Sequence, residues 1–232
     1  MNRSEIQKQL KEVPIFKELS TEEIDPIIEI AQPRFFKNRM YAFMQGDPLD
    51  RVFFIHSGRV KIYKTDPSGR EQIVSILETG EMFPHAGFFR KGLYPAHAEM
   101  MEDSSLIVIP ISKFEEILIS YPGLSIKLFR VLGEKIVDLQ ERLEEQILHN
   151  SYEQIIMLLL RLCRTNGEKK ENGFRITAHF TNKELANMIG TSRETVSRTI
   201  NYLKKKDFLQ LDEDGCYLID HEKLHQELFT VN

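Results

Sequence analysis

The sequence predicts an α+β protein: an N-terminal antiparallel β-roll of the jelly-roll type, a long dimerisation helix and a C-terminal winged helix-turn-helix. Three observations carry this prediction. Short apolar runs separated by turn residues fill the first half of the chain. After Pro110 the apolar period becomes helical. Near the C-terminus, two helical segments with capping residues flank a glycine, as a tight bihelical unit requires. We expect three parts, residues 1–111, 112–149 and 150–232.

The composition fits a globular chain of two domains. With 41% hydrophobic and 28% charged residues among 232, the chain is neither disordered nor fibrous. Its net charge of −4 argues against a surface coated in basic residues but allows a local basic face. The chain lacks a run of 18 apolar residues and the apolar core of a signal peptide, so we expect no membrane contact and a cytoplasmic location.

Cys163 and Cys216 are the only cysteines, and they lie far apart in the sequence. One is inside an apolar helical run and the other is beside a turn. Two isolated thiols cannot supply the four ligands of an iron–sulfur cluster or a structural zinc by themselves. We expect both to be reduced packing residues.

The first part begins with a helix from Ser20 to Ile30, whose STEE start has the form of a capping box. Between Gln32 and Ile111, the runs VFFIH, VKIYK, IVSIL and LIVIP are rich in β-branched and aromatic residues, which favours strands. Turn sequences such as SG and DPSG separate them. Such regular spacing predicts a sandwich or jelly roll.

The second part is helical. A short helix is predicted from Ser112 to Ser120 and a long one from Leu124 to His149. Spacings of four and three alternate along the long helix, as in the seam of a two-stranded coiled coil. The seam residues are Leu132, Ile136, Leu139, Leu143 and Gln146. This stripe could instead be the buried face of an intramolecular helix; the helix length and the charges on its other faces favour a homodimer.

The third part begins with an apolar helix from Ser151 to Arg164. We hypothesise that the chain can bend between the domains at a hinge near His149 and Asn150. A polar loop is predicted from Thr165 to Gly173. The strand FRITAHF, two helices, the hairpin FLQLDEDGCYLID and a last amphipathic stretch, HEKLHQELF, complete the chain.

Residues 181–206 have the anatomy of a helix-turn-helix. Thr181 and Glu184 form a T-x-x-E capping box for the first helix. Thr191 and Glu194 could cap the second helix in the same way. Three further residues fit this unit. Ala186 is small enough to let the helices approach, and Gly190 can take the positive φ of the turn. Val196 is an apolar residue that packs inside the angle between the helices.

Polar residues at the start of the second helix suit the base edges of double-stranded DNA. Arg193 and Arg198 can each donate two hydrogen bonds to guanine. Glu194 can accept from cytosine N4, and Ser197 suits a donor or an acceptor. Residues 175–206 hold seven basic and two acidic residues, which is a local basic face. The alternative is that Glu194 only caps the helix and the arginines form a solvated face.

The stretch SRETVSR, together with the predicted roll and long helix, resembles the CRP/FNR family of bacterial transcription regulators over nearly the whole chain. The motif is close to the recognition helix of the cyclic-AMP receptor protein. The resemblance implies that Arg193, Glu194 and Arg198 read a TGTGA-type half-site in an inverted repeat, TGTGA-N6-TCACA. Ser197 departs from the glycine of that protein and matches FNR, which bears on the second base. The implied phosphate contacts are Ser192, Thr195 and Thr181.

The resemblance also implies an effector pocket in the roll, but the usual cyclic-nucleotide residues are absent. In nucleotide binders of this fold, G-E-L-x-L-F is followed by R-S-A. Here Pro84 and His85 replace the glycine and the glutamate, and Tyr94-Pro95-Ala96 replaces R-S-A. Losing that arginine removes a charge-assisted contact to phosphate, so tight cyclic-AMP binding is not expected.

Another small-molecule effector could occupy a pocket in the roll. The predicted lining is Phe83, His85, Tyr94 and His97, with Arg90 or Lys91 as an alternative anion contact. The competing interpretation is that aromatic residues fill a roll that needs no ligand. Those residues are Phe83, Phe88, Phe89 and Tyr94.

The chain also resembles regulators of the arginine deiminase pathway in low-GC Gram-positive bacteria, which implies control of anaerobic or arginine catabolism genes. The oxygen sensor of FNR needs a cysteine cluster, so no iron–sulfur cluster is expected. Family members recruit RNA polymerase through a surface loop, and the loop from Lys169 to Gly173 is the predicted place. The alternative there is a solvated turn.

No enzyme motif is found, so no catalytic residue is assigned and the chain is expected not to be an enzyme. His221 and His225 share a helix face at a spacing that suits a metal, but no third ligand is near in sequence. We therefore predict no metal or other cofactor. The rival function is a cytosolic ligand-binding or protein-interaction module whose winged helix contacts protein instead of DNA.

Overall fold

The computed structural model describes residues 3–13, 16–17, 19–85, 91–171 and 173–230. The chain forms two compact units, which divide between Val137 and Asp138. We call residues 1–137 the roll unit and residues 138–232 the C-terminal unit. The division falls inside one long helix, so the predicted hinge at His149 and Asn150 lies within the C-terminal unit.

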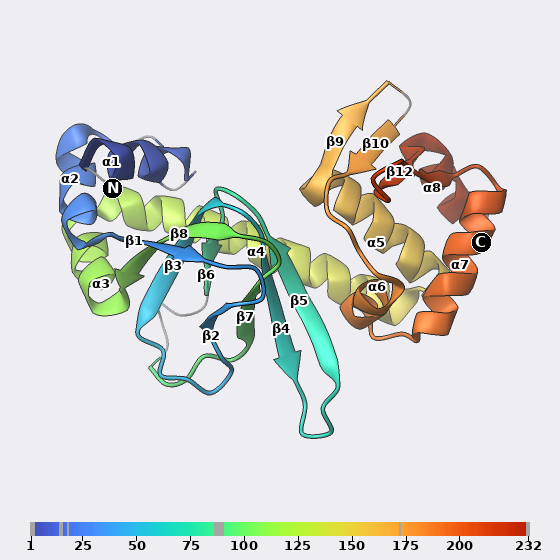
Figure 1. Ribbon diagram of the computed structural model, residues 1–232, viewed down its shortest axis with the longest axis horizontal. Helices are drawn as coiled ribbons and strands as arrows, with labels where there is room; N and C mark the ends of the chain where they lie inside the picture. Colours follow the sequence, from blue (N-terminus) through green and yellow to red (C-terminus); the bar gives the residue numbers. More distant parts are fainter. Residues whose placement is uncertain (1–2, 14–15, 18, 86–90, 172, 231–232) are drawn as a thin grey trace. The chain divides into compact units, whose positions relative to one another are not determined.

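Two four-stranded antiparallel sheets build the roll unit, in the orders β1-β8-β3-β6 and β2-β7-β4-β5 (Figure 1). Neighbouring strands are mostly distant in sequence, which confirms the predicted roll. The strands are β1 (Gln32–Phe36), β2 (Tyr41–Phe43), β3 (Arg51–Ser57), β4 (Val60–Thr65), β5 (Glu71–Leu77), β6 (Met82–Phe83), β7 (His97–Met100) and β8 (Ser104–Pro110).

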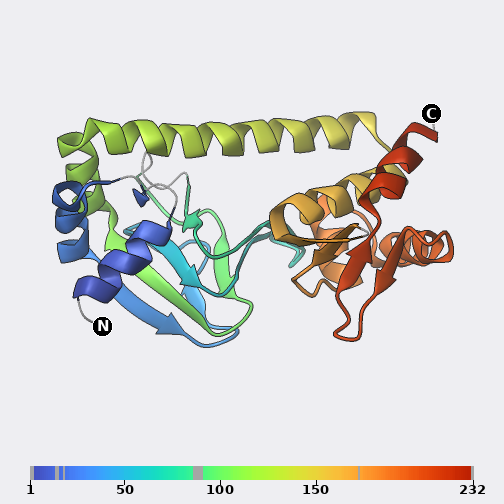
Figure 2. The same ribbon diagram turned by 90° about the horizontal axis from the view of Figure 1, so that it is seen from above.

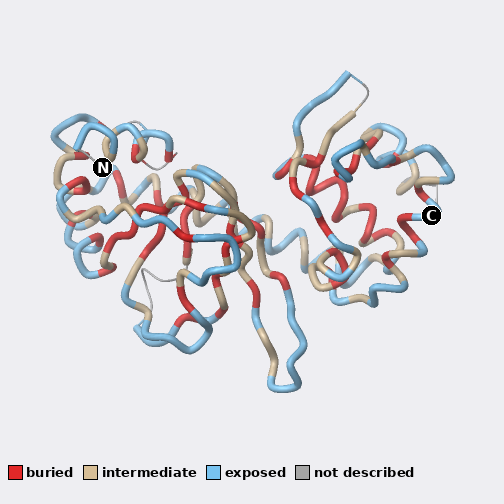
Figure 3. Tube along the Cα trace, in the orientation of Figure 1, coloured by how far each residue is buried: buried red, intermediate tan, exposed pale blue. Residues whose placement is uncertain are grey.

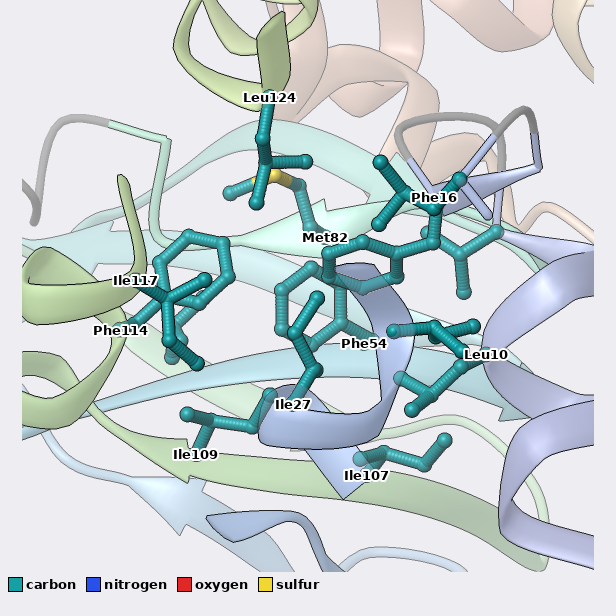
Figure 4. Close-up of a cluster of buried hydrophobic side chains, with 14 of the residues drawn as sticks. Leu10, Phe16, Ile27, Phe54, Met82, Ile107, Ile109, Phe114, Ile117 and Leu124 are labelled. Atoms are coloured by element: carbon teal, nitrogen blue, oxygen red, sulfur yellow. The ribbon is translucent and has the colours of Figure 1, made fainter. Parts of the chain in front are cut away.

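Strands β3 and β8 are apolar on both faces because each face meets a different core. Phe53 and Val108 point into the interior of the roll. Phe54 and Ile107, their chain neighbours, point into a second core formed with the helices (Figure 4). This double burial explains why the runs VFFI and LIVI show no apolar–polar alternation.

The second core is formed with α1 (Arg3–Glu12), α2 (Thr21–Ile30), α3 (Ile111–Ser120) and the first turns of the long helix that follows α3. The capping box predicted for α2 is confirmed, since Ser20 and Glu23 exchange backbone and side-chain hydrogen bonds. Helix α1 was not predicted from the sequence. It is mostly polar and buries a single residue of its own, Leu10, so its apolar period is too weak to detect.

Helix α4 (Pro122–Leu148) follows α3 after Tyr121 and is continuous (Figure 2). The predicted boundaries, Leu124 and His149, are therefore within two residues of those observed. Leu124 and Leu128 are buried in the core shared with α1–α3. Within the described ranges, no helix is long and apolar enough to cross a bilayer.

The C-terminal unit contains helices α5 (Ser151–Asn166), α6 (Asn182–Ile189), α7 (Arg193–Lys205) and α8 (His221–Thr230). Its antiparallel sheet has the order β11-β12-β10-β9. The strands are β9 (Gly167–Lys170), β10 (Gly173–Ile176), β11 (Leu209–Leu211) and β12 (Tyr217–Ile219). Most of α5 is buried (Figure 3), which accounts for its apolar sequence.

The polar loop predicted from Thr165 to Gly173 is wrong in part, because α5 extends to Asn166 and residues 167–170 then pair with β10. Strand β9 lies at the edge of the sheet, and three of its four residues are exposed. Its backbone pairing therefore leaves no apolar alternation in the sequence. The hairpin predicted from Phe208 onward is confirmed as β11 and β12.

Both cysteines are buried and free, as expected for packing residues. Burial raises the pKa of the Cys163 thiol to about 12. Its thiolate is therefore a minor species at neutral pH.

Candidate nucleic-acid interface

Helices α6 and α7 meet at a sharp turn around Gly190. The Thr181 hydroxyl accepts from the Glu184 N–H at 3.2 Å and a Glu184 carboxylate oxygen accepts from the Thr181 N–H at 2.9 Å, which confirms the capping box. Gly190 ends α6 with φ 71° and ψ 30°, the left-handed conformation that glycine adopts without strain. Only Thr191 and Ser192 then separate it from α7.

The three predicted packing positions of this turn are also confirmed. Ala186 and Val196 are buried, and the Ala186 carbonyl accepts hydrogen bonds from the N–H groups of Gly190 and Thr191. A larger residue than alanine would separate the two helices. The bihelical unit is thus held by backbone geometry and by small side chains.

Ser192 caps α7, so the predicted pair of Thr191 and Glu194 is wrong by one residue. The Ser192 hydroxyl accepts from the Thr195 N–H at 3.1 Å, and Ser192 has the extended backbone of an N-cap. Glu194 is exposed and, among the described residues, its carboxylate makes no hydrogen bond or ion pair. Because Ser192 caps the helix, the Glu194 carboxylate does not have to serve both as a cap and as a base contact.

The predicted base-reading residues lie on the solvent side of α7. Val196, Thr199, Ile200 and Leu203 form the buried side of the helix. Arg193, Glu194 and Arg198 are exposed, and Ser197 is half-buried beside them. Two hydrogen-bond donors, Arg193 and Arg198, and one acceptor, Glu194, are therefore exposed together on α7.

The hydroxyls predicted to contact phosphates already take part in helix caps. The Thr181 hydroxyl donates to Glu184 at 2.8 Å in addition to its capping bond. The Ser192 and Thr195 hydroxyls lie 3.0 Å apart. These groups sit at helix N-termini, where the helix dipole also favours an anion.

The basic face is smaller than the sequence suggested, because Arg175 lies on β10 and is paired with acidic residues. Its guanidinium pairs with Asp212 at 2.6 Å and with Asp214 at 2.8 Å. Lys183, Lys205 and Lys206 remain exposed with the two arginines of α7. The positive charge is thus concentrated on α6 and α7.

Aromatic contacts, which were not predicted from the sequence, hold α7 against its neighbours. The ring of Tyr202 meets that of Tyr152 on α5 edge to face, with centroids 5.8 Å apart. The Tyr152 hydroxyl donates to Glu227 on α8 at 2.8 Å. Together these residues fix the orientation of α7 within the C-terminal unit.

Comparison with known proteins agrees with this geometry. Residues 33–121 match the cyclic nucleotide-binding domain family, and residues 153–227 match the Crp-like helix-turn-helix domain. The chain belongs to the CRP/FNR family of DNA-binding transcription regulators.

Two relatives align over most of the regulator. It is 26% identical over 210 residues to the CRP-like cAMP-activated global transcriptional regulator of Mycobacterium tuberculosis, covering 90% of this chain and 94% of that protein. It is 24% identical over 208 residues to the anaerobic regulatory protein of Bacillus subtilis, covering 89% and 87%. Among solved structures, a CooA mutant from Carboxydothermus hydrogenoformans has the same fold, with a TM-score of 0.75, 22% identity and coverage of 94% and 95%.

Three of the five predicted seam residues of α4 are exposed in the regulator: Ile136, Leu139 and Leu143. The other two have partners within the chain. Leu132 packs against the helical core of the roll unit, and the Gln146 amide donates to the Ile189 carbonyl at 3.2 Å. The exposed apolar stripe instead continues through three residues outside the predicted seam, Ile126, Phe129 and Ile147.

The structure does not bring the four predicted effector residues onto one surface. Phe83 and Tyr94 are buried in the interior core of the roll. His97 lies on the other face of its strand, where its ring stacks on Tyr63 at 4.8 Å and its Nδ1 accepts from the Gln45 N–H at 3.2 Å. A side chain on the outer face of a sheet cannot line the interior.

Tyr94 fills the place where the resemblance expects the phosphate-binding segment. Its ring stacks on Phe43 with centroids 3.6 Å apart. Its hydroxyl donates to the Arg51 carbonyl at 2.9 Å and accepts from the Arg51 N–H at 3.1 Å. Burial raises the pKa of Tyr94 to about 12, so the phenol stays neutral.

His85 is half-buried near an ion pair between Glu81 and Lys135 of α4, which are 2.9 Å apart. Burial, aided by the Lys135 ammonium, lowers the pKa of His85 to about 4. The imidazole is therefore neutral at physiological pH. Of the other residues considered for this pocket, Lys91 is exposed, while Phe88, Phe89 and Arg90 lie outside the described residues.

The remaining predicted features lie on α8 and on the β9–β10 hairpin. The rings of His221 and His225 stack with centroids 6.2 Å apart. Over the described part of the chain, no three His, Cys, Asp or Glu side chains are grouped for a metal ion. Lys169 and Lys170 are exposed on β9, and residue 172 is outside the described residues.

Proposed function

We propose that two copies of this regulator bind an inverted repeat related to TGTGA-N6-TCACA, each placing the start of α7 in a major groove. The solvent face of α7 carries the proposal. Arg193 and Arg198 can donate to guanine, and Glu194 can accept from cytosine N4. Glu194 neither caps the helix nor forms an ion pair with a described residue, so its carboxylate is available to a base.

The exposed stripe of α4 supports the homodimer. Phe129, Ile136, Leu143 and Ile147 are each more than half exposed in the single chain. Their spacings of seven, seven and four keep them on one side of the helix. Burying such a stripe against the same stripe of a second copy removes apolar surface from water, and a two-fold interface is self-complementary. Two α7 helices would then read half-sites about one helical turn apart.

We propose that the roll does not bind cyclic AMP through the usual phosphate contact. The support is Tyr94, which occupies the position of the expected arginine and whose hydroxyl is hydrogen-bonded to the backbone of Arg51. We also propose no iron–sulfur cluster, since Cys163 and Cys216 are buried in different parts of the C-terminal unit. A different small molecule as the effector remains a proposal without an assigned site.

The finer biological assignment is control of anaerobic or arginine catabolism genes in the cytoplasm. Its support is the similarity to the anaerobic regulatory protein of Bacillus subtilis and the resemblance to arginine deiminase regulators. RNA polymerase is the proposed partner at the β9–β10 hairpin, where Lys169 and Lys170 are exposed.

Fluorescence anisotropy with two duplexes tests the central proposal. One carries the inverted repeat, and the other carries the same bases in scrambled order. We expect tighter binding to the repeat by about three orders of magnitude or more, with two chains per duplex. Equal affinity for the two duplexes would refute sequence-specific recognition and favour the protein-interaction alternative.

A further inference from the structure

Helix α7 carries one more polar residue on its solvent side to which no role has yet been assigned. Asn201 is exposed, and among the residues that the structure describes its side chain makes no hydrogen bond. It lies two turns beyond Glu194, between Arg198 and Lys205. The fold makes no use of its amide.

The direction of Asn201 follows from the helical period of about 100° per residue. The buried side of α7 is formed by Val196, Thr199, Ile200 and Leu203. Glu194, Arg198, Asn201 and Lys205 all lie within about 30° of the direction opposite the centre of that side. Asn201 is therefore central on the exposed face and shares that face with two of the proposed base contacts.

The same spacing occurs where a recognition helix reads several bases at once. In homeodomains, residues at i, i+3, i+4 and i+7 of the recognition helix meet the major groove together. Glu194, Ser197, Arg198 and Asn201 have this spacing. Asn201 lies about 10 Å along the axis from Glu194, which corresponds to roughly three base-pair steps.

We propose that Asn201 is a further specificity-determining residue, which reads an adenine in the major groove. Its amide offers one acceptor and one donor side by side, matching the N6 amino group and N7 of adenine. The adjacent Tyr202 is held against Tyr152, so Asn201 is the side chain of this turn that can reach a base. Lys205, one turn further on, matches a phosphate instead.

This inference rests on the proposed DNA-binding function, and the experiment separates the two. The wild-type protein and the Asn201→Ala variant each select binding sites from a randomised duplex library. Anisotropy titrations then use the best selected duplex and three copies in which the assigned adenine is replaced by each other base. We expect the wild-type protein to prefer adenine there by about 5- to 150-fold per half-site, the range that one bidentate contact supplies.

Asn201→Ala should abolish this preference while the positions read by Arg193, Glu194 and Arg198 keep theirs. Lys205→Ala is the matched control, because it lies on the same face and should weaken all four duplexes alike. If Asn201→Ala behaves like Lys205→Ala, or leaves every preference intact, Asn201 is not a base contact. If the wild-type protein selects no inverted repeat at all, the proposed function itself fails, and this inference fails with it.

Discussion

Ser192 and Glu194, two residues apart at the start of α7, have different roles: Ser192 caps the helix, and Glu194 is the proposed base contact. The Ser192 hydroxyl satisfies the Thr195 N–H, so the Glu194 carboxylate is not needed by the helix. A carboxylate near a helix N-terminus is also favoured by the helix dipole. A negative group on the proposed DNA-facing surface of α7 therefore does not weaken the fold.

Replacing Arg193 with alanine should reduce specificity more than general affinity. We expect binding to the inverted repeat to weaken by about 5- to 150-fold while binding to the scrambled duplex changes little, because a guanine contact is lost and most phosphate contacts remain. Competition anisotropy measures both values. Equal losses on the two duplexes would make Arg193 a phosphate contact.

His85 should make the free energy of unfolding of the roll unit decrease as the pH falls. Because burial and Lys135 lower its pKa to about 4, the unfolded chain takes up the proton first as the pH falls below about 6.5. Stability is therefore lost between pH 6.5 and 4, by at most about 3 kcal/mol from this group. Urea denaturation of the wild-type protein and of His85→Asn at pH 7 and 4.5 measures the difference. The same loss in both proteins would show that another group causes it.

At the scale of elements, the sequence predicts those helices and strands whose buried side chains form a continuous or regularly spaced apolar pattern. Strands β3 and β8 and helix α5 are buried over most of their length, so their apolar runs mark them. Strand β9 and helix α1 bury almost nothing of their own and were missed. An edge strand is paired through its backbone to one neighbouring strand, and its side chains need not be apolar. The side chains of GEKK in β9 therefore do not indicate a strand.

The predicted seam of α4 mixes residues from two apolar stripes that share the helix. Leu124, Leu128 and Leu132 face the core of their own roll unit, whereas Phe129, Ile136 and Leu143 face solvent. Both sets are apolar and both have spacings of three, four or seven. Only the observed packing of α1, α2 and α3 against one stripe shows which side chains of the other stripe are exposed.

Leu143→Lys should make the regulator monomeric. The side chain is 61% exposed in the single chain, so the change does not disturb a core, but it would place a charge inside the proposed dimer interface. Sedimentation equilibrium should then give the mass of one chain instead of two. Glu134→Lys is the control, since Glu134 is exposed on another face of α4 and should leave the dimer intact. A dimeric Leu143→Lys protein would rule out this stripe as the interface.

At the scale of the whole molecule, residues close in sequence were placed better than residues brought together by the sheet. The proposed recognition residues fall within two turns of one helix, so the helical period alone places them on one side of it. Phe83, Tyr94 and His97 come from separate segments of the roll. Their relation depends on strand register, and one residue of register decides whether a side chain lies inside or outside.

The uneven charge of the molecule leads to a last prediction. A net charge of −4 repels DNA at long range, while Lys183 on α6, Lys205 on α7 and Lys206 at the C-cap of α7 are exposed. If Arg193 and Arg198 contact bases, the three lysines of each copy can make about six phosphate contacts per dimer. A plot of the logarithm of the binding constant against the logarithm of the salt concentration should then have a slope of about −5. Titrations of the inverted repeat between 50 and 300 mM salt, roughly the range over which such slopes are resolved, measure it. Lys205→Ala should reduce the slope by about 2 because a dimer loses two contacts. A slope near zero would mean that α7 does not approach the phosphates, and the docking of α7 in the major groove would then be wrong.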